Sequence, residues 1–176
     1  MYAGLGGEIL YRPFGKKFVL GAESYQVFKR DPYSLFNTGL NGDHLLTGHL
    51  QAWYEFPDHS LTLQARVGRY LAEDTGGTLA LSRQFDNGTK LEAFATVTSR
   101  ADFDVFGSTT HLYSGLKLSL PLGNIRYIPQ GSQILMTAAP LGRDAGQSLD
   151  SPIKLYDISE QLSYRHISRT WSQITE

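Results

Sequence analysis

Glutamates that could carry out acid–base chemistry recur in runs where apolar and polar residues alternate. They are Glu8, Glu23, Glu55 and Glu92. Two carboxylates flanking a glycosidic bond are the requirement of a glycoside hydrolase. The same kind of run also carries Arg12, Arg66 and Lys117, and an enclosed carboxylate is usually paired with such a cation. We therefore favour ion pairing, with an outer-membrane hydrolase as an alternative.

Four aromatic residues share the polar register of these runs. They are Trp53, Tyr70, Phe94 and Tyr113. Sugars stack their CH faces on aromatic rings, and their hydroxyls bond to carboxylates, amides and guanidinium groups. The aromatics therefore have two interpretations: packing between strands or an aromatic girdle, which we favour, and a carbohydrate-binding surface.

Together these residue types predict a ligand-binding surface for a polysaccharide. Its predicted members are Glu8, Glu23, His49, Trp53, Glu55, Arg66, Tyr70, Glu92, Tyr113 and Lys117. The five histidines include no i,i+4 pair and the chain has no cysteine, so neither a metal site nor a cofactor is predicted. Ser82 or Ser114 could act with His49 in a hydrolase, but the chain has no G-x-S-x-G motif.

These side chains reach one surface only if the runs are β-strands. Leu50 and Tyr54 alternate with His49 and Gln51, which places apolar and polar residues on opposite faces of a strand. Similar alternation fills three further runs, which are 61–68, 91–98 and 112–120. The sequence therefore predicts strands with one apolar and one wet face.

Segments with Gly, Pro, Asn and Asp separate the runs and predict turns. They are 13–16, 57–59, 74–77 and 86–88. The last two enclose a short fifth strand, and Asp86-Asn87-Gly88 is a strong hairpin signal because Asn and Gly tolerate positive φ. We predict an all-β, antiparallel up-and-down meander of about eight strands over residues 1–140. Residues 141–176 are expected to be a loop and a tail that is irregular or forms a short helix.

Both a membrane barrel and a soluble sandwich show such alternation, so strand length and the polar face must discriminate between them. Several runs reach the roughly 9–11 residues of a transmembrane strand. Charged residues stand in mid-run, as in the wall of a water-filled lumen, and short connections alternate with long ones. We expect an outer-membrane-type β-barrel, or a section of one because the C-terminus lacks a terminal aromatic strand. A soluble β-barrel or sandwich that binds carbohydrate or lipid is the alternative.

Bulk composition restricts the class further. The net charge is −1 with 19% charged residues and no basic run, so nucleic acid is not expected as a partner. No stretch approaches the roughly 18 apolar residues of a transmembrane helix. Residues 2–8 lack the basic and apolar regions of a signal peptide, so we expect a mature form or a portion of a longer chain.

Five short strings, in this order, resemble the C-terminal part of the YjbH/GfcD-like exopolysaccharide and group 4 capsule proteins. The strings are Gly6–Pro13, Leu46–Leu50, Val67–Ala72, Leu81–Gly88 and Gly115–Leu122. Each string alone has low specificity, whereas five in order are fairly specific.

This resemblance implies an outer-membrane β-barrel protein of the Gram-negative cell envelope that serves secretion or assembly of an extracellular polysaccharide. It implies polysaccharide and outer-membrane lipid as partners, together with periplasmic or lipoprotein components of the same export system. It carries over no catalytic residue, so we expect a non-enzymatic component.

Overall fold

The computed structural model of the chain is built around one antiparallel β-sheet. It describes residues 2–29, 44–56, 59–85, 87–103, 108–123, 132–140, 145–149, 151 and 154–160. The strands are β1 (Tyr2–Tyr11), β2 (Phe18–Lys29), β3 (His44–Phe56), β4 (Leu61–Arg69), β5 (Thr75–Gln84), β6 (Lys90–Phe103), β7 (Thr109–Pro121) and β8 (Gln133–Ala138). A single short helix, α1 (Leu155–Glu160), follows the sheet among the described residues.

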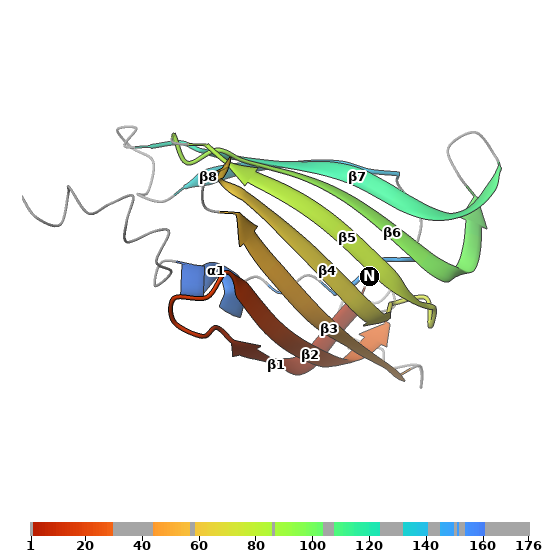
Figure 1. Cartoon of the computed structure of the whole chain (residues 1–176). Helices are drawn as coiled ribbons and strands as arrows, with labels where there is room; N and C mark the ends of the chain where they lie inside the picture. The colour runs from red at the N-terminus through yellow and green to blue at the C-terminus, as the bar shows by residue number, and fades with distance from the viewer. Residues whose placement is uncertain are drawn as a thin grey trace, which may run out of the picture.

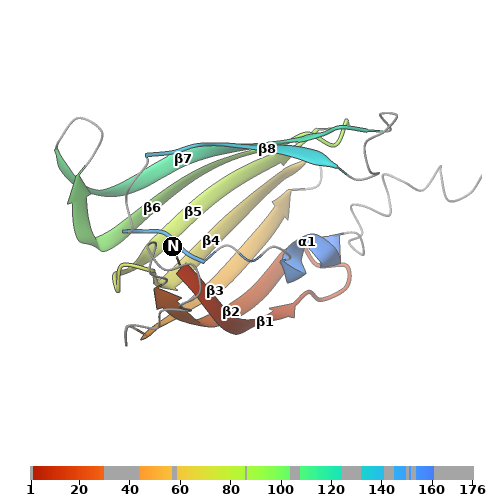
Figure 2. The same cartoon turned by 180° about the vertical axis from the view of Figure 1, so that it is seen from behind.

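Each strand pairs with its neighbours in the sequence, which makes the sheet an eight-stranded up-and-down meander from β1 to β8. The sheet is strongly curved, with its convex side toward the viewer in Figure 1. In the described residues β1 and β8 do not pair with each other, so the sheet is open. Figure 2 shows the concave side, where α1 and the segment before it cross between β1 and β8. The predicted fold class is therefore confirmed, as a curved sheet that is not closed.

The apolar face of the sheet is exposed and the polar face is buried, which is the reverse of a sheet in a soluble protein. In β3 every second residue is buried, and four of the six buried residues are polar: Thr47, His49, Gln51 and Glu55. Leu50 is 63% exposed on the convex face, whereas the neighbouring His49 is 3% exposed on the concave face. The predicted division of each strand into an apolar and a polar face is thus correct, and the apolar face is the outer one.

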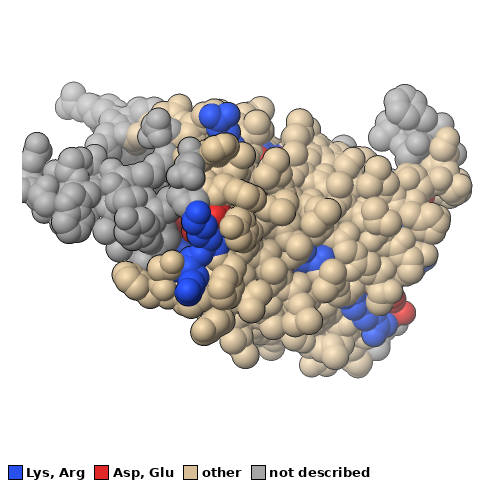
Figure 3. Space-filling view, viewed as in Figure 1, with Lys and Arg blue, Asp and Glu red and all other residues tan. Residues whose placement is uncertain are grey.

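The convex face carries a broad band of exposed apolar side chains. Its members include Ile9, Leu20, Leu46, Leu50, Tyr54, Leu63, Val67, Leu79, Leu81, Leu91, Val97, Leu112 and Leu116. Figure 3 views this side, and charged side chains lie mainly toward its borders. A monomer in water rarely exposes a contiguous apolar surface of more than a few hundred Å². An exposed apolar band of this kind is typical of a surface that contacts lipid or another protein.

The buried apolar residues form two small clusters on the concave side. Val19, Trp53 and Tyr156 make one of them. The other joins Val27, Leu45 and Leu71, with Leu149 packed against it. Each cluster thus includes or contacts a residue that follows the sheet in sequence. The C-terminal segment, which we define as residues 145–149 and 154–160, therefore contributes to the core of the protein.

Two glycines allow close approach at the concave face. A Cβ on Gly68 would clash with the carbonyl oxygen of Gly48 and with His49 in the adjacent strand. A Cβ on Gly21 would lie 2.9 Å from the indole of Trp53. Because neither backbone nor a packed ring moves cheaply, glycine is required at both positions.

The fifth strand differs from its prediction. It was expected to be short and to follow a turn at 74–77, but β5 has ten residues and begins at Thr75. Gly76 and Gly77 pair with Gly68 and Val67 of β4, so they lie within the ladder. A possible strand at 125–127 lies outside the described residues.

Candidate functional site: the concave face

Polar side chains from successive strands meet on the concave face because every second residue points inward. Gln64 Nε2 donates a hydrogen bond to Gln51 Oε1 at 3.0 Å, joining β4 to β3. Lys117 Nζ lies 3.6 Å from Glu92 Oε1, joining β7 to β6. His49 Nδ1 lies 3.0 Å from Glu23 Oε1, joining β3 to β2. Polar groups of the face are therefore linked across neighbouring strands.

A second set of hydrogen bonds links hydroxyl groups nearer the other end of the sheet. Tyr70 Oη lies 2.6 Å from Thr78 Oγ1, which in turn lies 2.8 Å from Thr96 Oγ1. The Tyr70 ring also packs edge-on against His49, with centroids 4.8 Å apart. Tyr70 is fully buried. This part of the face is a packed interior.

The first half of the C-terminal segment is held by three hydrogen bonds to the sheet and its turns. The backbone N–H of Gly146 donates to Asp74 Oδ2 at 2.9 Å, and Asp74 is buried. The N–H of Leu71 donates to the carbonyl of Gln147 at 2.9 Å. Arg66 Nη1 donates to Ser148 Oγ at 2.7 Å. The segment thus crosses the concave face at the end of β4.

The second half of the segment presents Tyr156 from α1 to the concave face. Its ring stacks on Trp53 with centroids 4.7 Å apart and an interplanar angle of 13°. Its hydroxyl donates a hydrogen bond to Glu55 Oε1 at 3.1 Å. Burial, followed by the Glu55 carboxylate, raises the pKa of Tyr156 well above its ordinary value of 10. Tyr156 is therefore an integral part of the interior.

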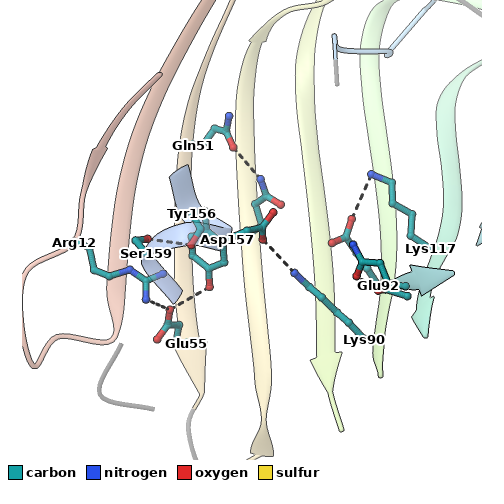
Figure 4. A network of polar contacts seen from close by, with 12 residues as sticks. Arg12, Gln51, Glu55, Lys90, Glu92, Lys117, Tyr156, Asp157 and Ser159 are labelled. Carbon is teal, nitrogen blue, oxygen red and sulfur yellow. Dashed lines mark hydrogen bonds and ion pairs between the residues drawn. The ribbon is translucent and has the colours of Figure 1, made fainter. Parts of the chain in front are cut away.

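Charged groups lie around Tyr156, as Figure 4 shows. Arg12 Nη1 lies 3.2 Å from Glu55 Oε1, and the guanidinium carbon lies 4.8 Å from the centroid of the Tyr156 ring. Lys90 Nζ lies 3.7 Å from Asp157 Oδ1, joining the start of β6 to α1. The N–H of Leu155 donates to Glu8 Oε2 at 2.9 Å.

Beside α1 the concave face opens into a cleft of about 590 Å³. Strands β1 to β8 all contribute to it, together with α1. Its lining includes Gln51, Gln64, Arg66, Ser82, Gln84 and Lys90 among other polar residues, with Trp53 and Tyr156 at one side. Amides, hydroxyls and charges of both signs next to aromatic rings are the groups that contact carbohydrate.

The structure brings six of the ten predicted site residues to this cleft. They are Glu8, Glu23, Trp53, Arg66, Glu92 and Lys117. The other four lie elsewhere on the same face: His49, Glu55 and Tyr70 are buried, and Tyr113 packs against Phe94 with ring centroids 5.5 Å apart. Ligand binding by any of the ten remains a prediction.

Sequence reasoning missed Tyr156, Asp157 and Asp74. Asp74 accepts a hydrogen bond from the backbone N–H of Gly146, 72 residues further along the chain. No local pattern signals these contacts, because each joins residues far apart in the chain. The available hint was that Tyr156 and Asp157, an aromatic and an acidic residue, occur in a tail that has no strand periodicity.

Within the described residues, no group of three or more His, Asp or Glu side chains could hold a metal ion. The helix that the structure describes is too short and too polar to cross a membrane.

The fold and the face define a class of protein: an all-β chain whose curved antiparallel sheet exposes its apolar face and encloses its polar one. The chain belongs to the YjbH family, whose model is described as "Exopolysaccharide biosynthesis protein YbjH" and matches residues 1–161. A relative is the "Uncharacterized lipoprotein YjbH" of Escherichia coli (strain K12), which is 34% identical over 167 residues, or 93% of this chain. The chain spans 23% of that relative's length. No solved structure matches the chain. The resemblance found in the five strings is confirmed.

Proposed function

We propose that the chain forms a section of the wall of an outer-membrane β-barrel that serves secretion or assembly of an exopolysaccharide without catalysing a reaction. The observation that carries the proposal is the inverted exposure of the sheet. In β3 Leu50 and Tyr54 point outward, whereas His49 and Gln51 are enclosed. In a bilayer the outward residues contact lipid, and the enclosed ones line the lumen.

Strand length supports this location. Strands β1 to β7 have 9 to 14 residues each, which suffices to cross the hydrocarbon core of a bilayer. Each exposed leucine would be stabilised by roughly 1.5–3 kcal/mol on transfer from water to an apolar environment. Lipid supplies that environment over the whole convex face at once.

The open edges of the sheet favour a section of a barrel wall rather than a complete barrel. Backbone groups at the free edges of β1 and β8 would lack partners in lipid, at several kcal/mol for each group. Further strands beside β1 and β8 would satisfy them. The relative of this chain is several times longer, and its length is compatible with a larger barrel.

The chemistry of the lumen face supports contact with a polysaccharide. The cleft offers donors such as Arg66 and Lys90 and acceptors such as Gln51, next to the indole of Trp53. The carboxylates of Glu55 and Glu92 are each paired with a cation, at 3.2 and 3.6 Å. Carboxylates engaged by cations in this way favour a binding role over a catalytic one.

The proposed location is the outer membrane of a Gram-negative cell, with outer-membrane lipid around the convex face. Periplasmic or lipoprotein components of the same export system are the proposed protein partners. The lipoprotein named among the relatives is consistent with a cell-envelope setting.

The test compares two arginines of β4 in a host that lacks the chromosomal copy of the gene. Arg66→Met removes a cation that lines the cleft, whereas Arg69→Met alters the exposed end of the same strand. We expect Arg66→Met to reduce secreted polysaccharide to about half or less while the protein stays in the outer-membrane fraction. Arg69→Met should secrete normally. Normal secretion by Arg66→Met, or recovery of the protein as a detergent-free monomer, contradicts the proposal.

A further inference from the structure

We infer that the face of the Trp53 ring that Tyr156 covers is a saccharide subsite, and that Tyr156 occupies this subsite when no saccharide is bound. The inference deepens the function proposed above and rests on it, since that function supplies a polysaccharide as the ligand. The subsite consists of Trp53, Arg12 and Glu55.

Tyr156 makes the contacts that a pyranose ring would make. Its flat face lies parallel to the indole of Trp53 at 4.7 Å, the arrangement in which a sugar presents its CH face to an aromatic ring. Its hydroxyl donates to Glu55, as a sugar hydroxyl donates to a carboxylate. The aromatic ring thus fills a place that suits a flat, partly apolar ring edged with hydroxyls.

The guanidinium group of Arg12 has two nitrogen donors that this arrangement does not use. Its Nη1 is engaged by Glu55 at 3.2 Å, whereas Nε and Nη2 are buried without a hydrogen-bond partner among the described residues. Tyr156 offers Arg12 only its ring face. Buried guanidinium donors are costly to leave unpaired, and the oxygens of a saccharide would satisfy them.

The subsite is continuous with the cleft. Trp53 and Tyr156 both line the cleft, together with Arg66 and with Gln64, the residue that pairs with Trp53 in β4. A saccharide chain lying in the cleft therefore abuts the edge of the Tyr156–Trp53 stack. Displacement of Tyr156 would extend the binding surface by the face of Trp53.

The contacts that hold the C-terminal segment in place permit displacement. Around α1 the Lys90–Asp157 pair is 33% and 57% exposed, and exposed pairs of this kind contribute little. Tyr156 is the one buried residue of α1. At its other end the segment depends on Gly146, which has φ of +76° and donates to Asp74. Each end offers a substitution that weakens docking.

The experiment uses tryptophan emission in the full chain. Trp53 and Trp171 are the two tryptophans of the sequence, so Trp171→Phe leaves Trp53 as the sole reporter. In that background we would compare the parent with Tyr156→Ala, Gly146→Ala and Ile158→Ala. Ile158 lies on α1 with a 52% exposed side chain and serves as the control. The probes are cello-oligosaccharides and oligogalacturonates, in micelles of the sugar-free detergent lauryldimethylamine oxide.

Tyr156→Ala should bind at least one probe about tenfold more tightly than the parent. If Tyr156 fills the subsite about nine-tenths of the time, the subsite is open for about one-tenth of the time, and the apparent affinity of the parent is about tenfold below the intrinsic affinity. Gly146→Ala should change affinity in the same direction, since alanine is strained at this φ and its Cβ would lie 3.1 Å from Thr96. Ile158→Ala should match the parent.

The inference is overturned if neither Tyr156→Ala nor Gly146→Ala binds either probe more tightly than the parent, or if Ile158→Ala gains as much. Should Tyr156→Ala lose its β-sheet circular dichroism, Gly146→Ala decides the outcome alone, because it leaves every residue of the subsite intact. If the variants gain no affinity but Arg66→Met still reduces secretion, only the Trp53 subsite is rejected. Normal secretion by Arg66→Met rejects the proposed function itself.

Discussion

Leu50 and Gln51 are neighbours in β3 and have opposite surroundings. Leu50 is 63% exposed on the convex face, whereas Gln51 is 9% exposed and accepts a hydrogen bond from Gln64. In a soluble sheet with one wet face the exposures of this pair would be exchanged. The pair summarises the property on which the proposed function depends, because lipid outside and a polar lumen inside satisfy both residues.

A charge at the centre of the convex face should be costly in a bilayer. For Leu50→Lys we expect a loss of about 2–4 kcal/mol in the free energy of unfolding, since a lysine near the bilayer midplane loses its hydration. Guanidinium unfolding in phospholipid vesicles would measure it. Gln64→Lys, on the cleft side of β4, is the control and should change stability much less. Equal effects of the two substitutions would contradict the assignment of the faces.

Gly68 should tolerate no side chain, because its Cβ would clash with the carbonyl of Gly48 and with His49. We expect Gly68→Ala to destabilise the sheet by about 1–3 kcal/mol through overpacking. Gly7→Ala is the matched control, as no atom lies within 4 Å of its Cβ position. Denaturant midpoints of the two variants would test this. A stable Gly68→Ala protein would show that β3 and β4 are less closely packed.

Asp74 should anchor the C-terminal segment to the sheet. Asp74→Ala removes the acceptor of the Gly146 N–H and leaves that donor buried, at a cost of about 1–3 kcal/mol. The segment should then be cleaved faster in limited proteolysis, as followed by mass spectrometry. Glu73→Ala, at an exposed neighbouring residue, should leave the cleavage rate unchanged. Equal rates for Asp74→Ala and the parent would exclude the anchoring role.

Docking of α1 should weaken at alkaline pH. The pKa of Tyr156 is raised in the folded chain above the ordinary value of 10. Its contribution to stability is therefore fully present below pH 10 and decreases as the pH rises from 10 toward the folded pKa. The difference in phenolate absorbance between the parent and Tyr156→Phe should titrate above pH 10. A difference titration centred at or below 10 would mean that Tyr156 is not buried beside Glu55.

Local periodicity was sufficient to predict the strands and their faces. One run was expected at 61–68 and β4 is Leu61–Arg69, while another was expected at 112–120 and β7 is Thr109–Pro121. Alternation with a period of two identifies both the strand and the residues that share a face. Prediction of the faces placed all ten candidate residues on the concave side.

Contacts between distant segments could not be predicted in this way. Thr75-Gly76-Gly77 has the composition of a turn, yet β5 includes all three, because Gly76 lies against the carbonyl of Val97 in β6. The packing of Tyr156 on Trp53 joins residues that no periodicity relates. Such contacts follow from the curvature and register of the whole sheet, which local propensity does not specify.

The most direct test of the central claim is the depth of two side chains of β5 in a bilayer. The chain has no cysteine, so Leu79→Cys and Ser82→Cys each accept a single fluorescent label. Leu79 is exposed on the convex face and Ser82 lines the cleft. Nitroxide-labelled lipid chains should quench the label at 79, and aqueous iodide should quench the label at 82. Quenching of both labels by iodide alone would contradict the account, because it would place the convex face in water.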